Sequence, residues 1–412
     1  MSLIVQKFGG SSVADVHKIR LCAQRAKQAH EDGRRVVVVV SAMGKTTDGL
    51  IALARDANET LPKRDLDMLL STGEQVSAAL MSMTLKSLGL SAIAFTGQQV
   101  GVSTTDSHTR ARIASIDAAH LKTHLDEGKV VVVTGFQGVT RTGDITTLGR
   151  GGSDLTAVAL AAALKADVCE IFTDVDGVYT TDTRIVPEAR KLDRISYEQM
   201  LELASLGAKV MHPRAVLCGK NFNVPIHVRH SHRPDQGTMI VSETPEMEQI
   251  VVSGAALKSD IGRVTLAGVP NTPQTAQVIF DAVADADIFV DDIIQNETGD
   301  GLVTISFTVE HNELADAGPC AERIVESLGK GDVHIDVGLA KVSVVGVGMR
   351  SHTGVAATMF RALGAANVNI RNITTSEIKI SCIIDKADGE KALRTVHDAF
   401  DLSNIAVAAT AD

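Results

Sequence analysis

Up to about residue 235 the chain alternates short runs of β-branched residues with longer Ala- and Leu-rich stretches whose apolar positions recur at helical spacing. The runs Val36–Val40, Val130–Val133 and Cys169–Phe172 are continuously apolar, as in parallel strands that helices cover on both faces. This alternation predicts a doubly wound α/β domain. We expect helices at 14–32, 63–88, 106–127, 154–166 and 196–204, several of which begin at an Asp or Ser cap.

The pattern breaks at two polar stretches, 233–237 and 242–247, which we interpret as a linker. Beyond it, segment 263–294 is similar to segment 341–373, and a repeat of roughly eighty residues indicates two copies of a βαββαβ module. A further strand is predicted at 249–254, one more than two consecutive modules need. The alternatives are two modules that follow each other along the chain, or two modules interleaved through strand 249–257. The predicted domains are 1–245, 246–340 and 341–412.

Composition excludes several classes of protein. The 412 residues include 40 Lys and Arg against 50 Asp and Glu, a formal net charge of -10, which lacks the basic footprint of nucleic-acid or anionic-membrane binding. There is neither a basic leader nor an apolar stretch of roughly 20 residues, so we expect a cytoplasmic protein. The five Cys are scattered without a Cys-x-x-Cys pair, which predicts free thiols and no zinc site.

Two Gly-rich turns follow predicted strands and open helices, a geometry in which backbone amides hold phosphate. The first contains Lys7, Gly9, Gly10 and Ser11, and its lysine supplies a point charge for phosphate oxygens. The second, 149–154, carries an arginine and three glycines, and would hold a carboxylate as well as a phosphate. Taken alone, each sequence fits a simple tight turn as well as it fits a phosphate site. The occurrence of both favours a phosphate-handling site.

Other candidate motifs are weaker. Gly44-Lys45-Thr46 lacks the earlier glycine of a P-loop. The histidines of segment 227–232 match no standard ligand spacing, so we predict a solvated surface and no metal site. In segment 172–182, three Asp and Tyr179 follow a strand, where carboxylates would accept hydrogen bonds from ribose or orient magnesium waters. The alternative is an ordinary acidic turn.

Taken together, five motifs resemble the motif set of the aspartate kinases, in the amino-acid kinase family. They are Lys7-Phe-Gly-Gly-Ser-Ser12, Ser71-Thr-Gly-Glu74, Gly149-Arg-Gly-Gly-Ser-Asp154, Thr173-Asp-Val-Asp-Gly-Val-Tyr179 and Gly207-Ala-Lys-Val-Met-His-Pro-Arg214. The C-terminal repeats resemble the ACT modules of these enzymes. The resemblance therefore implies an α/β fold: a three-layer αβα sandwich with a mostly parallel sheet, followed by two ferredoxin-like βαββαβ ACT modules.

By that resemblance, the chain transfers the γ-phosphoryl group of ATP to the side-chain carboxylate of L-aspartate, the first step toward lysine, threonine and methionine. Lys7 is the expected charge-neutralising group. We expect Asp154 both to hold Lys7 and to cap its helix; a helix cap alone is the alternative. The expected substrate-binding residues are Ser41, Thr47, Glu74, Arg150 and Ser153. Glu74 would meet the substrate ammonium and Arg150 a substrate carboxylate.

The residues that match the family's nucleotide site are Lys7, Gly9, Gly10, Ser11, Thr173, Asp174, Tyr179, Arg184, Lys209 and Val210. Magnesium is expected to be held mainly by the nucleotide phosphates. Where the family usually has Asp-Pro-Arg, this chain has Asp182-Thr183-Arg184, and the missing Pro is expected to loosen the contact of Arg184.

In the C-terminal half, the resemblance implies feedback inhibition by lysine, threonine or both. The expected effector residues are Asn271, Gln274, Ala276, Asp291 and Gln295, facing Asn369 and Ile370. Because the two copies differ in their first loops, one copy would bind effector while the other packs; modules used only for dimerisation are the alternative. We expect a homo-oligomer, and Met247 would permit a separate, shorter regulatory subunit.

Two rival functions remain at this stage. Another amino-acid kinase would act on glutamate, N-acetylglutamate, carbamate or UMP, but such relatives typically lack paired ACT modules, and Glu74 suits a free ammonium. A non-catalytic amino-acid sensor would not need Lys7, Glu74, Arg150 and Asp154 together.

Overall fold

The computed structural model describes residues 2–207 and 210–404, which divide into two compact units. The first unit ends at Gln249 and the second begins at Ile250, except that the segment Thr181–Arg190 groups with the second unit. None of the described helices is both long and apolar enough to cross a membrane.

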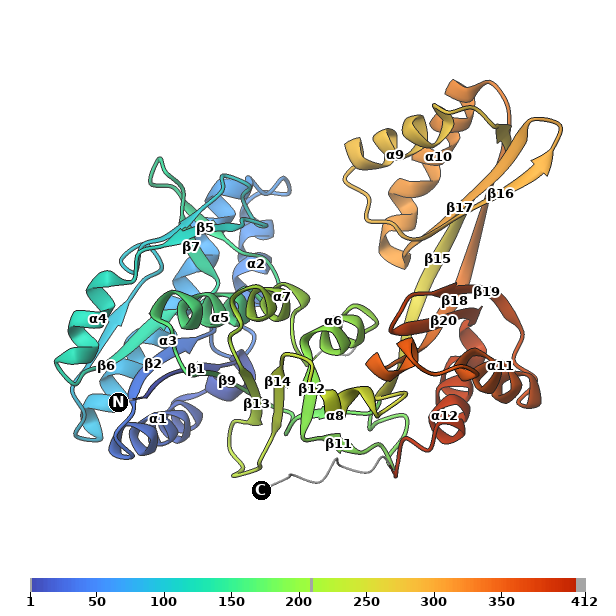
Figure 1. Cartoon of the computed structure of the whole chain (residues 1–412). Coiled ribbons are helices and arrows are strands. Elements are labelled where there is room, and N and C mark those ends of the chain that lie inside the picture. The colour runs from blue at the N-terminus through green and yellow to red at the C-terminus, as the bar shows by residue number, and fades with distance from the viewer. Residues whose placement is uncertain (1, 208–209, 405–412) are drawn as a thin grey trace. The chain divides into compact units, whose positions relative to one another are not determined.

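An eight-stranded sheet forms the centre of the first unit, with the order β12-β14-β13-β9-β1-β2-β6-β3 (Figure 1). All neighbours are parallel except β13 and β14. The strands are β1 (Leu3–Phe8), β2 (Arg35–Val40), β3 (Ala92–Phe95), β6 (Val130–Thr134), β9 (Val168–Thr173), β12 (Arg194–Ser196), β13 (Ile226–His230) and β14 (Thr238–Val241). The continuous apolar runs of β2 and β6 are fully buried, as the sequence predicts.

Helices cover both faces of this sheet. On one face, α1 (Val16–Glu31) and α3 (Lys63–Ser87) pack their small and apolar side chains onto β1, β2 and β6. The other face carries α4 (Ala119–Asp126), α5 (Gly152–Leu164) and α7 (Pro213–Phe222). Right-handed crossovers require this division, because the chain moves from β1 through β2 to β3 and then returns through β6 to β9 and β13.

Smaller elements complete the first unit. A four-stranded sheet has the order β5-β4-β7-β8, and β10 pairs with β11. Helix α2 packs on α3. The bounds are α2 (Thr46–Ala57), β4 (Val102–Thr104), β5 (Ile113–Ile116), β7 (Gln137–Val139), β8 (Ile145–Thr147), β10 (Val178–Tyr179), β11 (Lys191–Leu192), α6 (Tyr197–Ser205) and α8 (Pro245–Glu248).

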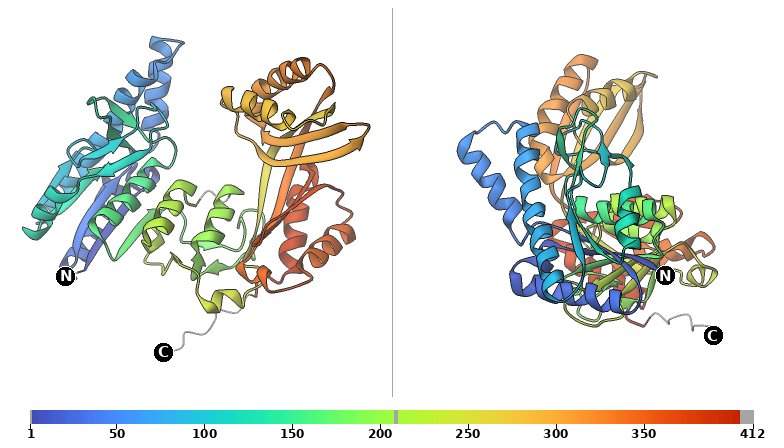
Figure 2. Two further views of the ribbon diagram at one scale, coloured as in Figure 1. Left: turned by 45° about the horizontal axis from the view of Figure 1, so that its top comes forward. Right: turned by 90° about the vertical axis from the view of Figure 1, so that its left-hand side faces the viewer.

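The second unit contains one six-stranded antiparallel sheet, with the order β16-β17-β15-β18-β20-β19. Its elements are β15 (Gly254–Pro270), α9 (Thr275–Asp285), β16 (Asp291–Gly299), β17 (Leu302–Glu310), α10 (Leu314–Leu328), β18 (Asp332–Val345), α11 (Val355–Ala365), β19 (Ile370–Thr375), β20 (Lys379–Asp385) and α12 (Gly389–Ala399). The long strands β15 and β18 run through both halves of the sheet (Figure 2, left).

Each half of the sheet uses part of both long strands. Residues 261–270 of β15 pair with β17, whereas residues 254–258 of β15 pair with 341–345 of β18. A bulge at Asp260, where φ is 59°, separates the two parts of β15. Helices α9 and α10 pack in one half and α11 and α12 in the other. The arrangement is two βαββαβ modules that share their long strands.

Two elements differ from the sequence prediction. The stretch 106–127 is helical only at Ala119–Asp126, and Ile113–Ile116 is instead the strand β5, paired with β4. Residues 249–253 are not in a strand, because β15 begins at Gly254. In the first case, cross-strand pairing in the small sheet overrides the helical preference of an Ala-containing segment.

Candidate active site

The predicted phosphate-binding residues lie at the carboxyl ends of the central strands. Strands β1 and β9 are parallel neighbours, but their connections leave in opposite directions along the sheet: the segment after β1 crosses toward β2 and the segment after β9 crosses toward β13. A crevice at such a switch point is where an open α/β sheet binds ligands. Lys7 is the penultimate residue of β1, Ser41 follows β2, and Thr173 ends β9.

Lys7 and Asp154 form an ion pair at this edge. The Lys7 Nζ and Asp154 Oδ1 atoms lie 2.5 Å apart, and both residues are buried, with 8% of their surface exposed. The N-cap of α5 is Gly151, without a side-chain capping bond, so Asp154 is a first-turn residue and not the cap. Of the two roles considered for Asp154, the geometry favours holding the Lys7 ammonium.

Glu74 is a buried carboxylate with one unsatisfied oxygen. Its Oε1 accepts a hydrogen bond from the Ala42 amide at 3.0 Å, whereas Oε2 is buried without a hydrogen-bond partner among the described residues. Burial raises the pKa of the Glu74 carboxyl to about 7. Gly73 makes this placement possible, since a Cβ on it would lie 2.9 Å from the Cβ of Ala42. A cationic ligand group would satisfy Oε2 and stabilise the ionised form.

In the first Gly-rich turn, the Gly9 amide donates to the Phe172 carbonyl at 3.2 Å, so it is already satisfied within the protein. A Cβ on Gly9 would approach the Lys7 Nζ to 3.4 Å. Gly9 therefore provides space beside the ammonium rather than a donor. The same contact joins β1 to β9, where the rings of Phe8 and Phe172 stack with centroids 4.9 Å apart.

The second Gly-rich turn is held in left-handed backbone conformation, with φ of 77° at Gly149 and 67° at Gly151. A Cβ on Gly151 would lie 2.3 Å from the ring of His212. Burial lowers the pKa of that imidazole, and its Nδ1 accepts from the Arg214 amide at 3.3 Å. The turn thus packs directly against the start of α7.

The remaining predicted substrate residues differ in their exposure. Ser153 is buried, and Gly135 after β6 leaves room for it, because a Cβ there would lie 2.7 Å from the Ser153 Oγ. Ser41 and Thr47 are half-buried. Arg150 is exposed, and among the described residues no partner of its guanidinium occurs. The Arg150 side chain is therefore available to an anionic ligand.

On the predicted nucleotide side, Thr173 Oγ1 donates to Asp174 at 3.0 Å. The Tyr179 hydroxyl donates to Asp176 at 2.9 Å, and burial together with this bond raises the pKa of Tyr179 to about 12. Arg184 belongs to the second unit, where its exposed guanidinium pairs with Asp182 at 2.6 Å. Val210 is half-buried, and Lys209 lies outside the described residues.

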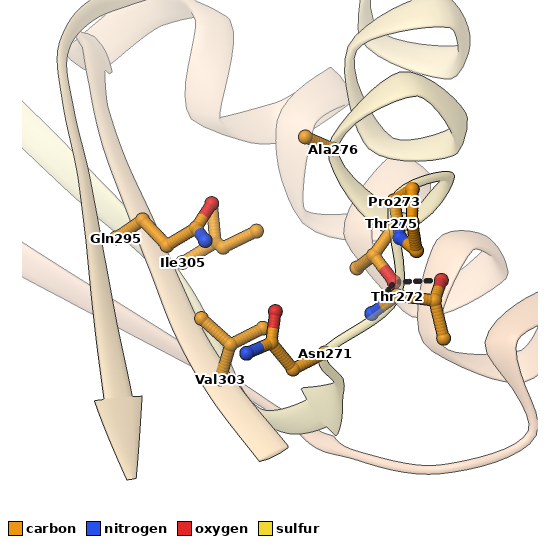
Figure 3. Close-up of a pocket in the computed structure, with 8 residues that line it drawn as sticks. All are labelled: Asn271, Thr272, Pro273, Thr275, Ala276, Gln295, Val303 and Ile305. Carbon is orange, nitrogen blue, oxygen red and sulfur yellow. Dashed lines mark hydrogen bonds between the residues drawn. The ribbon is translucent and has the colours of Figure 1, made fainter. Parts of the chain in front are cut away.

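In the second unit, a cavity of about 410 Å³ lies between the loop before α9 and the strands β16 and β17 (Figure 3). It is lined by Asn271, Thr272, Pro273, Thr275, Ala276, Gln295, Val303 and Ile305. Three of the predicted effector residues are among them: Asn271, Ala276 and Gln295. Gln274, Asp291, Asn369 and Ile370 do not line it, and Asp291 pairs with the buried Lys341 at 2.6 Å.

A model of the amino acid kinase family matches residues 2–230, and a model of the ACT domain matches residues 342–400. The chain is 50% identical over 404 residues to the aspartokinase of Pseudomonas aeruginosa, with 98% of each chain covered. It is 49% identical over 408 residues to that of Geobacillus stearothermophilus, with 99% of each chain covered. The chain belongs to the aspartokinases, within the amino acid kinase family. This confirms the resemblance drawn from the five motifs.

Solved structures of the family share the fold. Aspartokinase III of E. coli in complex with aspartate and ADP (R-state) aligns with a TM-score of 0.82 at 28% identity, covering 96% of this chain and 99% of that chain. The same enzyme in complex with lysine and aspartate (T-state) aligns with a TM-score of 0.75 at 27% identity, covering 97% and 99%. The predicted fold, a parallel α/β domain followed by ACT modules, is thereby confirmed.

Sequence reasoning missed two charged residues near the Arg150 turn. Asp67 is fully buried on α3, and Arg214 reaches from α7 to main-chain carbonyl groups of two loops. Asp67 lies seven residues before Glu74 and therefore on the same face of the helix. This spacing is the sequence signal that could have identified Asp67. Arg214 stands in the quoted motif, but nothing in the motif reveals its partners.

Proposed function

We propose that this aspartokinase-family chain transfers the γ-phosphoryl group of ATP to the side-chain carboxylate of L-aspartate, giving 4-phospho-L-aspartate, and that this step leads to lysine, threonine and methionine. The observation that carries the proposal is Glu74: a buried carboxylate whose Oε2 lacks a partner among the described residues, at the edge of the sheet where Lys7 and Asp154 pair. A free α-ammonium group is the ligand that this carboxylate fits.

The acceptor carboxylate is already anionic, so the reaction needs no general base. The main barrier is repulsion between the acceptor and the triphosphate, which cations and dipoles between the two relieve. Lys7 supplies the positive charge beside the migrating phosphoryl group, and Asp154 holds its ammonium in place. Arg150, with its exposed guanidinium, binds a substrate carboxylate, and Ser41, Thr47 and Ser153 supply hydroxyl groups.

ATP fits the residues at the ends of β1 and β9. Gly9 leaves space beside the Lys7 ammonium that a side chain would fill. Thr173, Asp174 and Tyr179 follow β9, and in this proposal they contact the nucleoside, together with Val210 and Lys209. Magnesium, held mainly by the phosphates, would neutralise part of their charge. No group of three or more potential metal-ligating side chains occurs in the described part of the chain.

Rival acceptors differ in the group that would meet Glu74. N-acetylglutamate has no ammonium, so it would leave the Oε2 atom unsatisfied, whereas glutamate differs from aspartate only by one methylene group. The E. coli relative is described in complex with aspartate and ADP. A pure amino-acid sensor is disfavoured because it would not need Lys7, Glu74, Arg150 and Asp154 together.

The test is formation of an acyl phosphate, trapped with hydroxylamine, in the presence of ATP and magnesium. L-Aspartate, L-glutamate and N-acetyl-L-glutamate are compared as acceptors. We expect turnover with aspartate alone. Turnover with N-acetyl-L-glutamate would contradict the role of Glu74, and tight aspartate binding without turnover would favour the sensor.

For regulation, we propose that lysine, threonine or both inhibit the enzyme by binding in the second unit. The E. coli relative is described in complex with lysine in its T-state, and the cavity beside Asn271 and Gln295 has a size suited to an amino acid.

The chain would act as a homo-oligomer through its ACT modules. A shorter subunit beginning near Met247 belongs to the same proposal; a search of the native host for that polypeptide tests it.

A further inference from the structure

Two charged side chains, each from a different helix, hold the loop that carries Arg150. Their hydrogen bonds go mainly to loop atoms. Arg150 comes after β8, from which Leu148 and Gly149 separate it. Its guanidinium is exposed, so the direction in which it points depends on how firmly its main chain is held. A long side chain on a mobile loop would lose more conformational entropy on binding a carboxylate than one on a rigid loop.

Asp67 holds this loop from α3. Its carboxylate is fully buried and accepts from Thr147 Oγ1 at 2.5 Å, from the Thr109 amide at 3.0 Å and bonds to His108 Nδ1 at 2.9 Å. Thr147 is the last residue of β8. One buried carboxylate therefore joins α3 to the segment 108–109 and to the start of the Arg150 loop.

The backbone of Thr109, whose amide donates to Asp67, is strained. Its φ is 68°, a left-handed conformation that costs a β-branched residue roughly 1 kcal/mol or more. In this conformation the Thr109 carbonyl comes within 3.1 Å of the position that a Cβ on Gly149 would take. Asp67 thus stabilises a strained segment that lies directly against the Arg150 loop.

Arg214 holds the same two segments from α7. Its Nη1 donates to the Leu148 carbonyl at 2.6 Å and its Nη2 to the Ala111 carbonyl at 2.9 Å. The planar guanidinium presents two donors at once, which a lysine ammonium does not do in the same fork. The Ala111 amide also donates to the Thr147 carbonyl at 3.0 Å, so segments 108–111 and 147–149 form one bonded unit.

We propose that Asp67 and Arg214 are positioning residues for the acceptor substrate. Together they hold the main chain of 147–149, so that Arg150 presents its guanidinium to the substrate carboxylate in a single orientation. Neither residue is expected to touch the substrate. The inference rests on the proposed function, because that function assigns Arg150 to a substrate carboxylate.

The experiment compares initial-rate kinetics of Arg214→Lys and Thr147→Val with those of the wild type. Thr147→Val keeps the side-chain shape and removes only the hydroxyl donor to Asp67. We expect the KM for aspartate to rise about 10-fold in each variant, while the KM for ATP stays within about twofold and kcat within about threefold. Equal increases in both KM values would indicate general destabilisation and would overturn the proposal.

Arg64→Ala is the matched control, because Arg64 also joins α3 to the hairpin that leads into β8. Its Nε donates to Asp144 at 2.8 Å, in an exposed pair away from the 147–149 main chain. We expect wild-type kinetics from this variant. A rise in the aspartate KM as large as that of Thr147→Val would mean that the loss of any side-chain bond to α3 has the same effect, which contradicts the specific role.

A double-mutant cycle separates this inference from the proposed function. If Arg214 acts through Arg150, Arg214→Lys should have no further effect on the aspartate KM in an Arg150→Ala background. Additive effects would overturn the inference alone. An Arg150→Ala variant with an unchanged aspartate KM would instead show that the proposed role of Arg150 is wrong.

Discussion

We expect substrate binding to depend on pH through Glu74, because burial raises the pKa of its carboxyl to about 7. Only the ionised form attracts the substrate ammonium, so the KM for aspartate should rise as pH falls through about 7 while the KM for ATP does not follow. Glu74→Gln keeps an acceptor for the Ala42 amide but loses the charge. Its aspartate KM should be about 30-fold higher, equivalent to about 2 kcal/mol for a charged hydrogen bond, and should not rise further as pH falls. An unchanged KM would remove Glu74 from the substrate site.

The same variant should change stability in a pH-dependent way. In the folded protein the pKa of Glu74 is raised from 4.5 to about 7, so the folded state binds the proton more tightly than the unfolded state. The stabilisation from the protonated carboxyl is complete below about pH 4.5 and is lost as pH rises through about 7. Glu74→Gln lacks this loss. The Tm of the variant relative to the wild type should therefore increase from pH 5 to pH 8, as thermal denaturation would show.

In the proposed mechanism, turnover depends on the positive charge of Lys7. We expect Lys7→Ala to reduce kcat by roughly 100- to 1,000-fold, the usual effect of removing one group that stabilises transition-state charge, while aspartate still binds. Because this variant leaves the buried Asp154 unpaired, the double variant Lys7→Ala with Asp154→Asn is the control for folding. If Lys7→Ala retains wild-type turnover, the assigned mechanism is wrong.

At the residue scale, the sequence indicated candidate groups for the chemistry but not the residues that hold them in place. Lys7, Glu74, Arg150 and Asp154 stand in recognisable motifs, and the structure places Lys7 and Asp154 in contact. Asp67 could not be recognised in the same way, because its partners include a backbone amide and a threonine hydroxyl that lie, respectively, 42 and 80 positions further along the chain. Such contacts depend on the path of two loops, which no local pattern specifies.

At the scale of elements, the turn that opens α5 depends on Gly151. Its φ is 67°, and a Cβ there would lie 2.3 Å from the His212 ring. Gly143 has a φ of 92° but nothing within 4 Å of its Cβ position. Both Gly→Ala changes introduce backbone strain of roughly 1 kcal/mol, and only Gly151→Ala adds a clash. We expect Gly151→Ala to lower kcat/KM for aspartate at least about 10-fold and Gly143→Ala to leave it unchanged. Equal kinetics would show that the His212 contact is unimportant.

Long elements with continuous or periodic apolar patterns were predicted within a few residues, as for α1, α3, β2 and β6. The failure at 106–118 has a physical reason. Ile113 and Ile116 are only half-buried, and β5 is stable because β4 supplies its hydrogen bonds, so the segment itself carries no clear strand signal. Local pattern is informative where burial is strong and weak where a small sheet depends on its neighbours.

On the scale of the whole molecule, the repeat in the sequence indicated two modules, and the structure shows how they are joined. Because β15 and β18 each contribute to both halves of one sheet, a displacement at the cavity beside β16 and β17 acts on strands that continue into the second module. The paired modules therefore share one continuous sheet within the second unit. Such a sheet suits a sensor that transmits the binding of one small ligand.

Inhibition by an amino-acid effector is the prediction that belongs to this scale. Gln295 lines the cavity, whereas Thr304 lies between the lining residues Val303 and Ile305 on β17 and faces the other side of the sheet. In the hydroxylamine assay with lysine, threonine or both, Gln295→Ala should raise the effector concentration for half-inhibition about 10-fold without changing the uninhibited rate, and Thr304→Ala should not. If neither amino acid inhibits the wild type, the regulatory proposal is wrong; if Gln295→Ala is inhibited normally, the effector binds elsewhere than this cavity.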